Sequence, residues 1–70
     1  MPLTHARIGR TYVISKISGP QHLRRQLAGF GIVPSGTVSL VNDNFGNMII
    51  QVRDSRLALN KTIAHHIHIN

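Results

Sequence analysis

The chain has 70 residues, and its eight lysines and arginines against two aspartates give a formal net charge of +6 at pH 7. A chain of this length forms one small domain, and the absence of cysteine excludes a disulfide framework, a thiolate nucleophile and a cysteine-based metal centre. The positive charge favours an anionic partner without choosing among RNA, an acidic protein surface and anionic lipid headgroups.

The chain opens with a stretch of low hydrophobicity. Residues 1–9 are expected to form an irregular arm, with Leu3 and Ile8 as its candidate anchors. No apolar run of signal-peptide or membrane-span length occurs, so we expect a cytosolic protein. Thr11 to Ile17 is rich in β-branched and aromatic residues and predicts the first strand.

A short helix is predicted after this strand. Ser18 or Gly19 can cap its first amides, Pro20 suits an opening turn, and Gln21 lies three residues after Ser18 as in a capping box. Gly29 supplies a left-handed position at which the helix can end.

The predicted helix has two different faces. Leu23, Leu27 and Phe30 recur at i, i+4 and i+7 and predict a buried apolar stripe. Arg24 and Arg25 face water. At about two turns the helix is too short to persist alone, so it needs a sheet to lie on.

The next stretch predicts a hairpin. Thr37 to Asn42 is expected to be a strand, and Met48 to Arg53 its returning partner. The expected core residues of the first of these strands are Val38, Leu40 and Val41. Phe45 sits at the tip of the intervening polar loop, where its ring is either a recognition anchor or a lid over the end of the core, and we favour the lid.

The remaining residues predict two more strands. A tight turn at Asp54 and Ser55 leads into a fourth strand from Arg56 to Leu59, with leucines alternating inward. Asn60 to Ala64 predicts one helical turn, and the ending HHIHIN predicts a fifth strand. Residues 1–70 are therefore expected to form a single mainly β domain, a small SH3-like antiparallel barrel with one short helix after the first strand.

Catalytic chemistry finds little support in this sequence. Asp43 and Asp54 are its only acidic residues and both lie in turn contexts, so there is no carboxylate pair for acid–base work. No nucleophile elbow or phosphate-binding loop is present. We expect neither enzymatic activity nor a cofactor.

Histidines provide the only candidate metal ligands. His66 and His68 share one face of the fifth strand, opposite Ile67 and Ile69, and imidazoles of this kind suit zinc, copper or nickel. Two imidazoles alone make a weak site, so we favour strand histidines that carry no ligand.

Several segments together resemble the FeoA family, small accessory proteins of bacterial ferrous-iron transport. They are the basic helix, the run GFGIVPSG, the strand TVSLV and the ending LALNKTIAHHIHI, and the resemblance covers residues 9–69. The family's usual Pro-Gly is replaced by Pro34-Ser35-Gly36, so a type I turn with Gly36 at its last position is expected.

This resemblance implies an SH3-like domain in the cytosol that binds FeoB, a ferrous-iron permease with a cytosolic GTP-binding domain, and that reaches the inner membrane through that partner. We predict that Arg24, Arg25 and Phe45 contact this partner, because a basic helix steers association and an exposed ring can anchor it. The alternative is a small basic SH3-like barrel that binds ribosomal or other RNA. The three aromatic residues of the whole chain argue against it, since they form no row of stacking rings.

Overall fold

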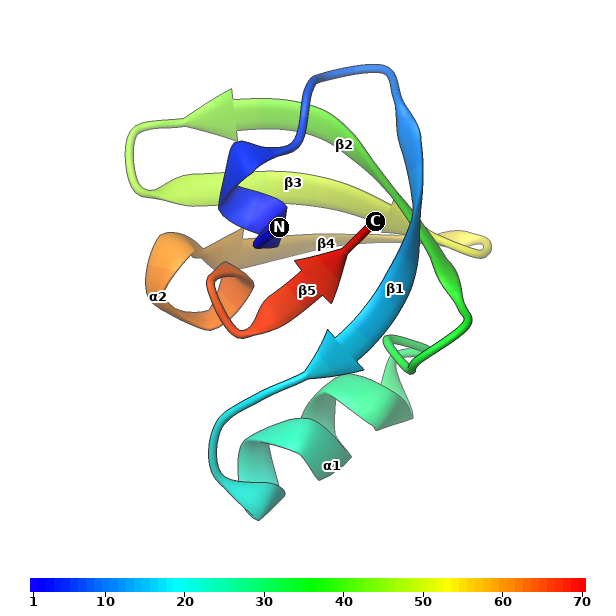
Figure 1. Cartoon of the computed structure of the whole chain (residues 1–70). Coiled ribbons are helices and arrows are strands. Elements are labelled where there is room, and N and C mark those ends of the chain that lie inside the picture. Colours follow the sequence, from blue (N-terminus) through cyan, green and yellow to red (C-terminus); the bar gives the residue numbers. More distant parts are fainter.

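The computed structural model describes residues 1–70 and has five antiparallel strands in one sheet, in the order β4-β3-β2-β1-β5 (Figure 1). The elements are a 3₁₀ turn η1 (Leu3–His5), β1 (Thr11–Ile17), α1 (Gln21–Gly29), β2 (Thr37–Asn44), β3 (Asn47–Val52), β4 (Ser55–Asn60), α2 (Lys61–Ala64) and β5 (Ile67–Ile69). The predicted mainly β fold with one short helix after the first strand is confirmed. No helix is long and apolar enough to cross a lipid bilayer.

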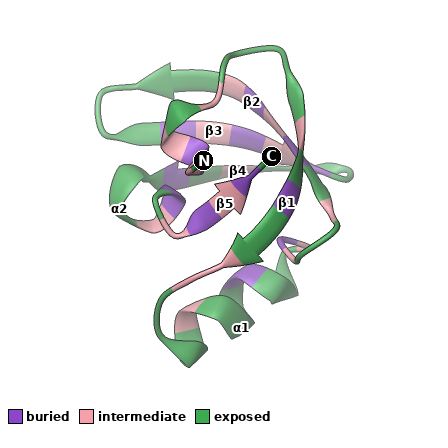
Figure 2. Cartoon of the chain, viewed as in Figure 1, coloured by how far each residue is buried: buried purple, intermediate pink, exposed green.

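The core lies inside the bent sheet, and alternate residues of the strands supply most of it (Figure 2). All thirteen buried residues are apolar, and no polar side chain is buried among them. They are Leu3, Ile14, Leu27, Ile32, Val38, Leu40, Met48, Ile50, Val52, Leu59, Ala64, Ile67 and Ile69. Because each strand turns one face inward, the alternation in the sequence predicted most of these positions.

The N-terminal segment is more ordered than the sequence predicts. Leu3 is completely buried, the Met1 amino group donates to the Ile69 carbonyl at 2.8 Å, and Pro2 forms a bridge with His68. The expected irregular arm is therefore wrong for this part, since it contains a 3₁₀ turn that packs beside β5. Of the two candidate anchors only Leu3 is one, because Ile8 is 59% exposed.

Helix α1 begins and ends differently from the prediction. Its N-cap is Pro20, and no side chain caps its amides, so the capping role of Ser18 is wrong. At its other end Gly31, not Gly29, adopts the left-handed conformation, with φ +91°. The Gly31 amide donates to the Ala28 carbonyl and the Ile32 amide to the Leu27 carbonyl, which is the Schellman pattern of helix termination.

This ending changes which residue continues the buried apolar stripe beyond α1. Leu27 is buried and Leu23 is partly buried, as predicted. Phe30 is 50% exposed, so its place in the apolar stripe is wrong. The Schellman ending is the reason, because it turns the chain at Gly31 and buries the residue that follows, Ile32. Ile32 thereby takes the core position that the periodicity predicts for Phe30.

Hairpin β2–β3 is longer than expected and has a tighter turn. Its pairing extends to Asn44 and Asn47, which leaves only Phe45 and Gly46 in the turn. Both have positive φ, as a type I′ turn requires. Phe45 is fully exposed, so the favoured lid role is wrong. Val41 lies where the register shifts and is only partly buried, so it is not a core residue.

Candidate protein-binding groove

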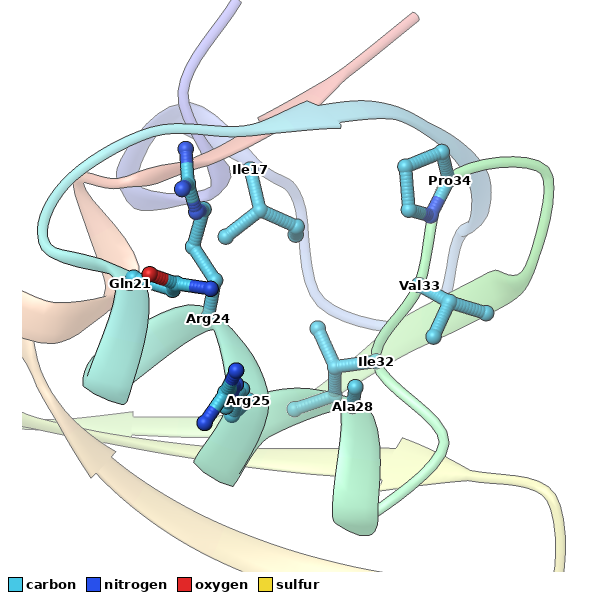
Figure 3. A pocket seen from close by; sticks show the side chains of 8 residues that line it. All are labelled: Ile17, Gln21, Arg24, Arg25, Ala28, Ile32, Val33 and Pro34. Carbon is cyan, nitrogen blue, oxygen red and sulfur yellow. The ribbon is translucent and has the colours of Figure 1, made fainter.

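A groove of about 340 Å³ lies between α1 and the chain that leads from α1 into β2 (Figure 3). We call it the α1 groove. Eight residues line it: Ile17, Gln21, Arg24, Arg25, Ala28, Ile32, Val33 and Pro34. They come from the end of β1, from one face of α1 and from the segment after the helix, so the groove depends on where α1 lies relative to β1.

The turn that follows the helix holds one wall of this groove. Ser35 has φ +74°, and the Gly36 amide donates to the Val33 carbonyl at 3.0 Å. The turn therefore runs from Val33 to Gly36, with proline as its second residue and the positive φ at its third. This is the geometry of a type II turn, so the predicted type I turn is wrong. Two hydrogen bonds tie this turn to β1, from the Ser35 amide to the Ile14 carbonyl and from the Ile14 amide to the Gly36 carbonyl, each 2.8 Å.

Helix α1 supplies the charge of the groove. Arg24 and Arg25 are exposed, as predicted, and both line the hollow (Figure 3). Neither has an acidic partner, because the single ion pair of the structure joins Lys61 Nζ to Asp43 Oδ1 at 3.4 Å. Two uncompensated guanidinium groups beside an apolar hollow make this face suited to an anionic ligand that also carries an apolar group.

Phe45, the third predicted contact residue, does not belong to this groove. It lies at the β2–β3 turn, whose Gly46 carbonyl accepts from the Lys61 amide, so this end of the hairpin adjoins α2 (Figure 1). The groove lies at the opposite end of the eight-residue strand β2, roughly 25 Å away along the strand. The structure thus brings Arg24 and Arg25 together and leaves Phe45 as a separate exposed site.

His66 and His68 also come together, around Ser18, which the sequence predicts as a helix cap. Ser18 Oγ lies 3.2 Å from His66 Nδ1 and 3.2 Å from His68 Nε2. A hydroxyl has a single proton, so Ser18 can donate to at most one ring and accepts from the other. The Ser18 amide also donates to the His66 carbonyl at 2.9 Å, so Ser18 joins the end of β1 to the beginning of β5.

The electrostatic surroundings of these histidines are positive. Partial burial lowers the pKa of His68 below its ordinary value of 6.5, and the nearby Lys16 ammonium and Met1 amino group lower it further. No three His, Cys, Asp or Glu side chains gather closely enough to hold a metal ion. That His66 and His68 carry no ligand stays a prediction, and the positive neighbours of the pair would oppose a bound cation.

Sequence reasoning found the two arginines but missed the apolar half of the groove. The sequence predicts Pro34 in a turn and Ile17 at the end of a strand, and it indicates no contact of either residue with α1. No local signal places them opposite α1, since their juxtaposition depends on where the helix ends. The Gly31-Ile32 pair was the one available signal, because a glycine followed by an aliphatic residue is typical of a Schellman ending.

The family comparison identifies a match along the whole chain. A model described as the FeoA domain matches residues 1–70. No curated protein sequence matches the chain.

Solved structures with the same fold fall into two groups. The crystal structure of an iron uptake regulatory protein (FeoA) is 25% identical, with a TM-score of 0.91, and the match covers 100% of this chain and 95% of that one. FeoA from Stenotrophomonas maltophilia, complexed with zinc and described as a prokaryotic SH3 domain protein, is 20% identical with a TM-score of 0.88, covering 100% and 89%. A manganese-dependent transcriptional repressor is 19% identical with a TM-score of 0.88, covering 99% of this chain but 40% of its own.

Proposed function

This chain belongs to the FeoA domain family, whose model matches residues 1–70, and on that premise we propose that it binds the cytosolic part of a FeoB-type GTPase-permease as an accessory protein of ferrous-iron uptake. The family match along the whole chain is the observation that carries the proposal. In this view the protein works in the cytosol, held near the inner membrane by its partner, and regulates or assembles the transporter without catalysing a reaction itself.

The surface of α1 supports a binding role. Arg24 and Arg25 are exposed and unpaired on a chain of net charge +6, so they can steer an acidic partner towards this face. Electrostatic steering raises association rates well above the roughly 10⁵–10⁶ M⁻¹s⁻¹ that is typical of neutral surfaces. Phe45 offers a second, separate contact, because a fully exposed aromatic ring is a common anchor in interfaces.

The direct test measures binding of the isolated cytosolic domain of FeoB by calorimetry. Arg24→Glu with Arg25→Glu reverses two charges on exposed positions and should weaken binding at least tenfold without changing the unfolding midpoint. Arg7→Glu with Arg10→Glu makes the same change in net charge on another exposed segment and should have a much smaller effect. Equal binding by the wild type and the Arg24/Arg25 variant at low salt would remove these arginines from the interface.

RNA binding is the second candidate, favoured by the net charge alone. The positions of the exposed aromatic rings argue against RNA binding. Phe30 follows α1 and Phe45 lies at the β2–β3 turn, so the two exposed phenylalanines form no continuous stacking surface. Tight binding of single-stranded RNA with a steep salt dependence, together with no binding of the FeoB domain, would favour this alternative.

Metal binding is tested independently of both. An anaerobic titration with Fe(II) or Zn(II), compared with a His66→Gln and His68→Gln variant, measures whether the two rings hold an ion. We expect no difference between the two proteins, because the pair lacks a third ligand and lies among positive groups.

A further inference from the structure

The α1 groove combines two features that together define one kind of ligand. We propose that it receives an acidic segment of the partner protein, with one apolar side chain of that segment in the hollow and its carboxylates on Arg24 and Arg25. The inference rests on the proposed function, because it names the part of the partner that would bind. It also assigns separate roles to the charged rim and the apolar interior.

The interior of the groove selects an apolar side chain. Ile17, Ala28 and Val33 are partly or fully exposed there, while buried Ile32 forms part of the wall. A volume of about 340 Å³ is near the lower end of the roughly 300–1,000 Å³ found for ligand sites, so the hollow has room for one or two side chains. Filling it removes apolar surface from water on both partners, which stabilises the complex.

The rim selects carboxylates. Neither aspartate lines the groove, since Asp43 pairs with Lys61 near the far end of β2 and Asp54 lies in the β3–β4 turn. Arg24 and Arg25 therefore keep their hydrogen-bonding capacity for a ligand. A guanidinium group binds a carboxylate through two parallel hydrogen bonds, so neighbouring acidic residues on the segment match this rim.

The walls are already in place without a ligand. The Ile32 amide donates to the Leu27 carbonyl, and the turn at Ser35 is tied to Ile14 by two hydrogen bonds. The segment after α1 is therefore held at both ends by backbone hydrogen bonds, so binding requires little ordering of this wall. A preformed hollow favours a protein segment over the other anionic partners, because a flat membrane surface does not enter it and neither exposed phenylalanine lines it to stack on a base.

The experiment separates the interior from the rim. Ala28→Leu fills the hollow without changing charge or helix propensity much, and the matched control is Ala58→Leu on the exposed face of β4. Arg24→Gln with Arg25→Gln removes the rim charge, and Arg7→Gln with Arg10→Gln is its control. The first probe is the isolated cytosolic domain of FeoB. Its binding is measured by calorimetry and by amide chemical-shift changes in the full chain.

We expect at least tenfold weaker binding for Ala28→Leu and for the Arg24/Arg25 variant, no change for either control, and shift changes concentrated at Gln21, Ala28 and Val33. If the domain binds but Ala28→Leu matches the wild type, or if the shifts cluster at Phe45, the groove inference is overturned while the proposed function stands.

If the wild type does not bind the domain even at low salt, the proposed function fails and a second probe decides the groove. It is the peptide Glu-Asp-Leu-Asp-Glu, with Lys-Lys-Leu-Lys-Lys as its charge-reversed control. Shifts at the groove with the acidic peptide only, abolished by Ala28→Leu, support the inference. No shifts with either peptide overturn it, as does binding of anionic vesicles that depends on Arg24 and Arg25 but not on Ala28.

Discussion

Ser35 occupies a backbone position that is better suited to glycine, and replacing it should stabilise the protein. Its φ is +74°, in the left-handed region, where an L-residue with a β-carbon costs roughly 1–2 kcal/mol. Glycine removes that cost but has a more disordered unfolded state, which offsets roughly 0.5–1 kcal/mol. The Ser35 side chain is exposed, so little packing is lost. Ser35→Gly should therefore raise the free energy of unfolding by about 0.5–1 kcal/mol, or the midpoint by about 2–8 °C.

Two control variants make this measurement specific. Ser35→Ala keeps the β-carbon and should remain within about 0.5 kcal/mol of the wild type in urea unfolding. Gly36→Ala should be destabilising, because its new β-carbon would lie 3.0 Å from the Val33 carbonyl oxygen, which belongs to the backbone of the same turn. If Ser35→Gly unfolds at the same urea concentration as Ser35→Ala, the left-handed strain at this residue is absent and the type II assignment is wrong.

Three further predictions concern the core, the histidine pair and the hairpin tip. Leu3→Ala should lower the free energy of unfolding by about 2–5 kcal/mol, because Leu3 is completely buried, whereas the exposed Ile8→Ala should lower it far less. Urea unfolding measures both variants, and equal effects would contradict the ordered N-terminal turn. The pKa of His68 is lower in the folded protein than in the unfolded chain, so the unfolded chain takes up the His68 proton first as the pH falls. The free energy of unfolding should therefore be constant well above pH 6.5 and should fall as the pH drops from 6.5 through the folded pKa. His68→Gln should flatten this decline in urea midpoints measured from about pH 8 to about pH 5, and an unchanged slope would rule out His68 as its source. Phe45→Ser should leave the thermal midpoint unchanged because its ring is fully exposed, and a clear loss of stability would revive the lid interpretation.

The strands were predictable because their signal is local. Val38 and Leu40 in β2, and Ile67 and Ile69 in β5, alternate with polar residues, and all four are buried. Side chains on a strand point to opposite faces with a period of two, so a few residues suffice to identify the inner face. The bounds of β1 agree with the prediction for the same reason.

The details that failed depend on residues far apart in the sequence. The Ser18 hydroxyl was assigned to the helix start, but it bonds to His66 and His68, which lie 48 and 50 residues later. Leu3 is buried because the first residues pair with β5, at the other end of the chain. No local pattern contains this information, since both contacts exist only after the sheet has formed.

The candidate site was half predictable for a related reason. The exposed arginines follow from helical periodicity, which turns Arg24 and Arg25 away from Leu23 and Leu27. The apolar hollow follows from the end of the helix, and two nearby glycines made that end ambiguous. Gly31 rather than Gly29 turns the chain, because this choice buries Ile32 beside the core and places Val33 opposite the helix.

Stability and binding should be separable in this protein because α1 contributes so little to the core. Leu27 is its only fully buried residue, and the other twelve core residues lie outside the helix. Arg24, Arg25 and Ala28 are exposed, so changing them should alter the free energy of unfolding by less than about 0.5 kcal/mol. A variant at these positions that loses its partner but keeps its unfolding midpoint therefore reports on recognition alone. A loss of binding with a matching loss of stability would instead mean that α1 has come away from the core, where Leu27 holds it, and the groove would be lost as a consequence.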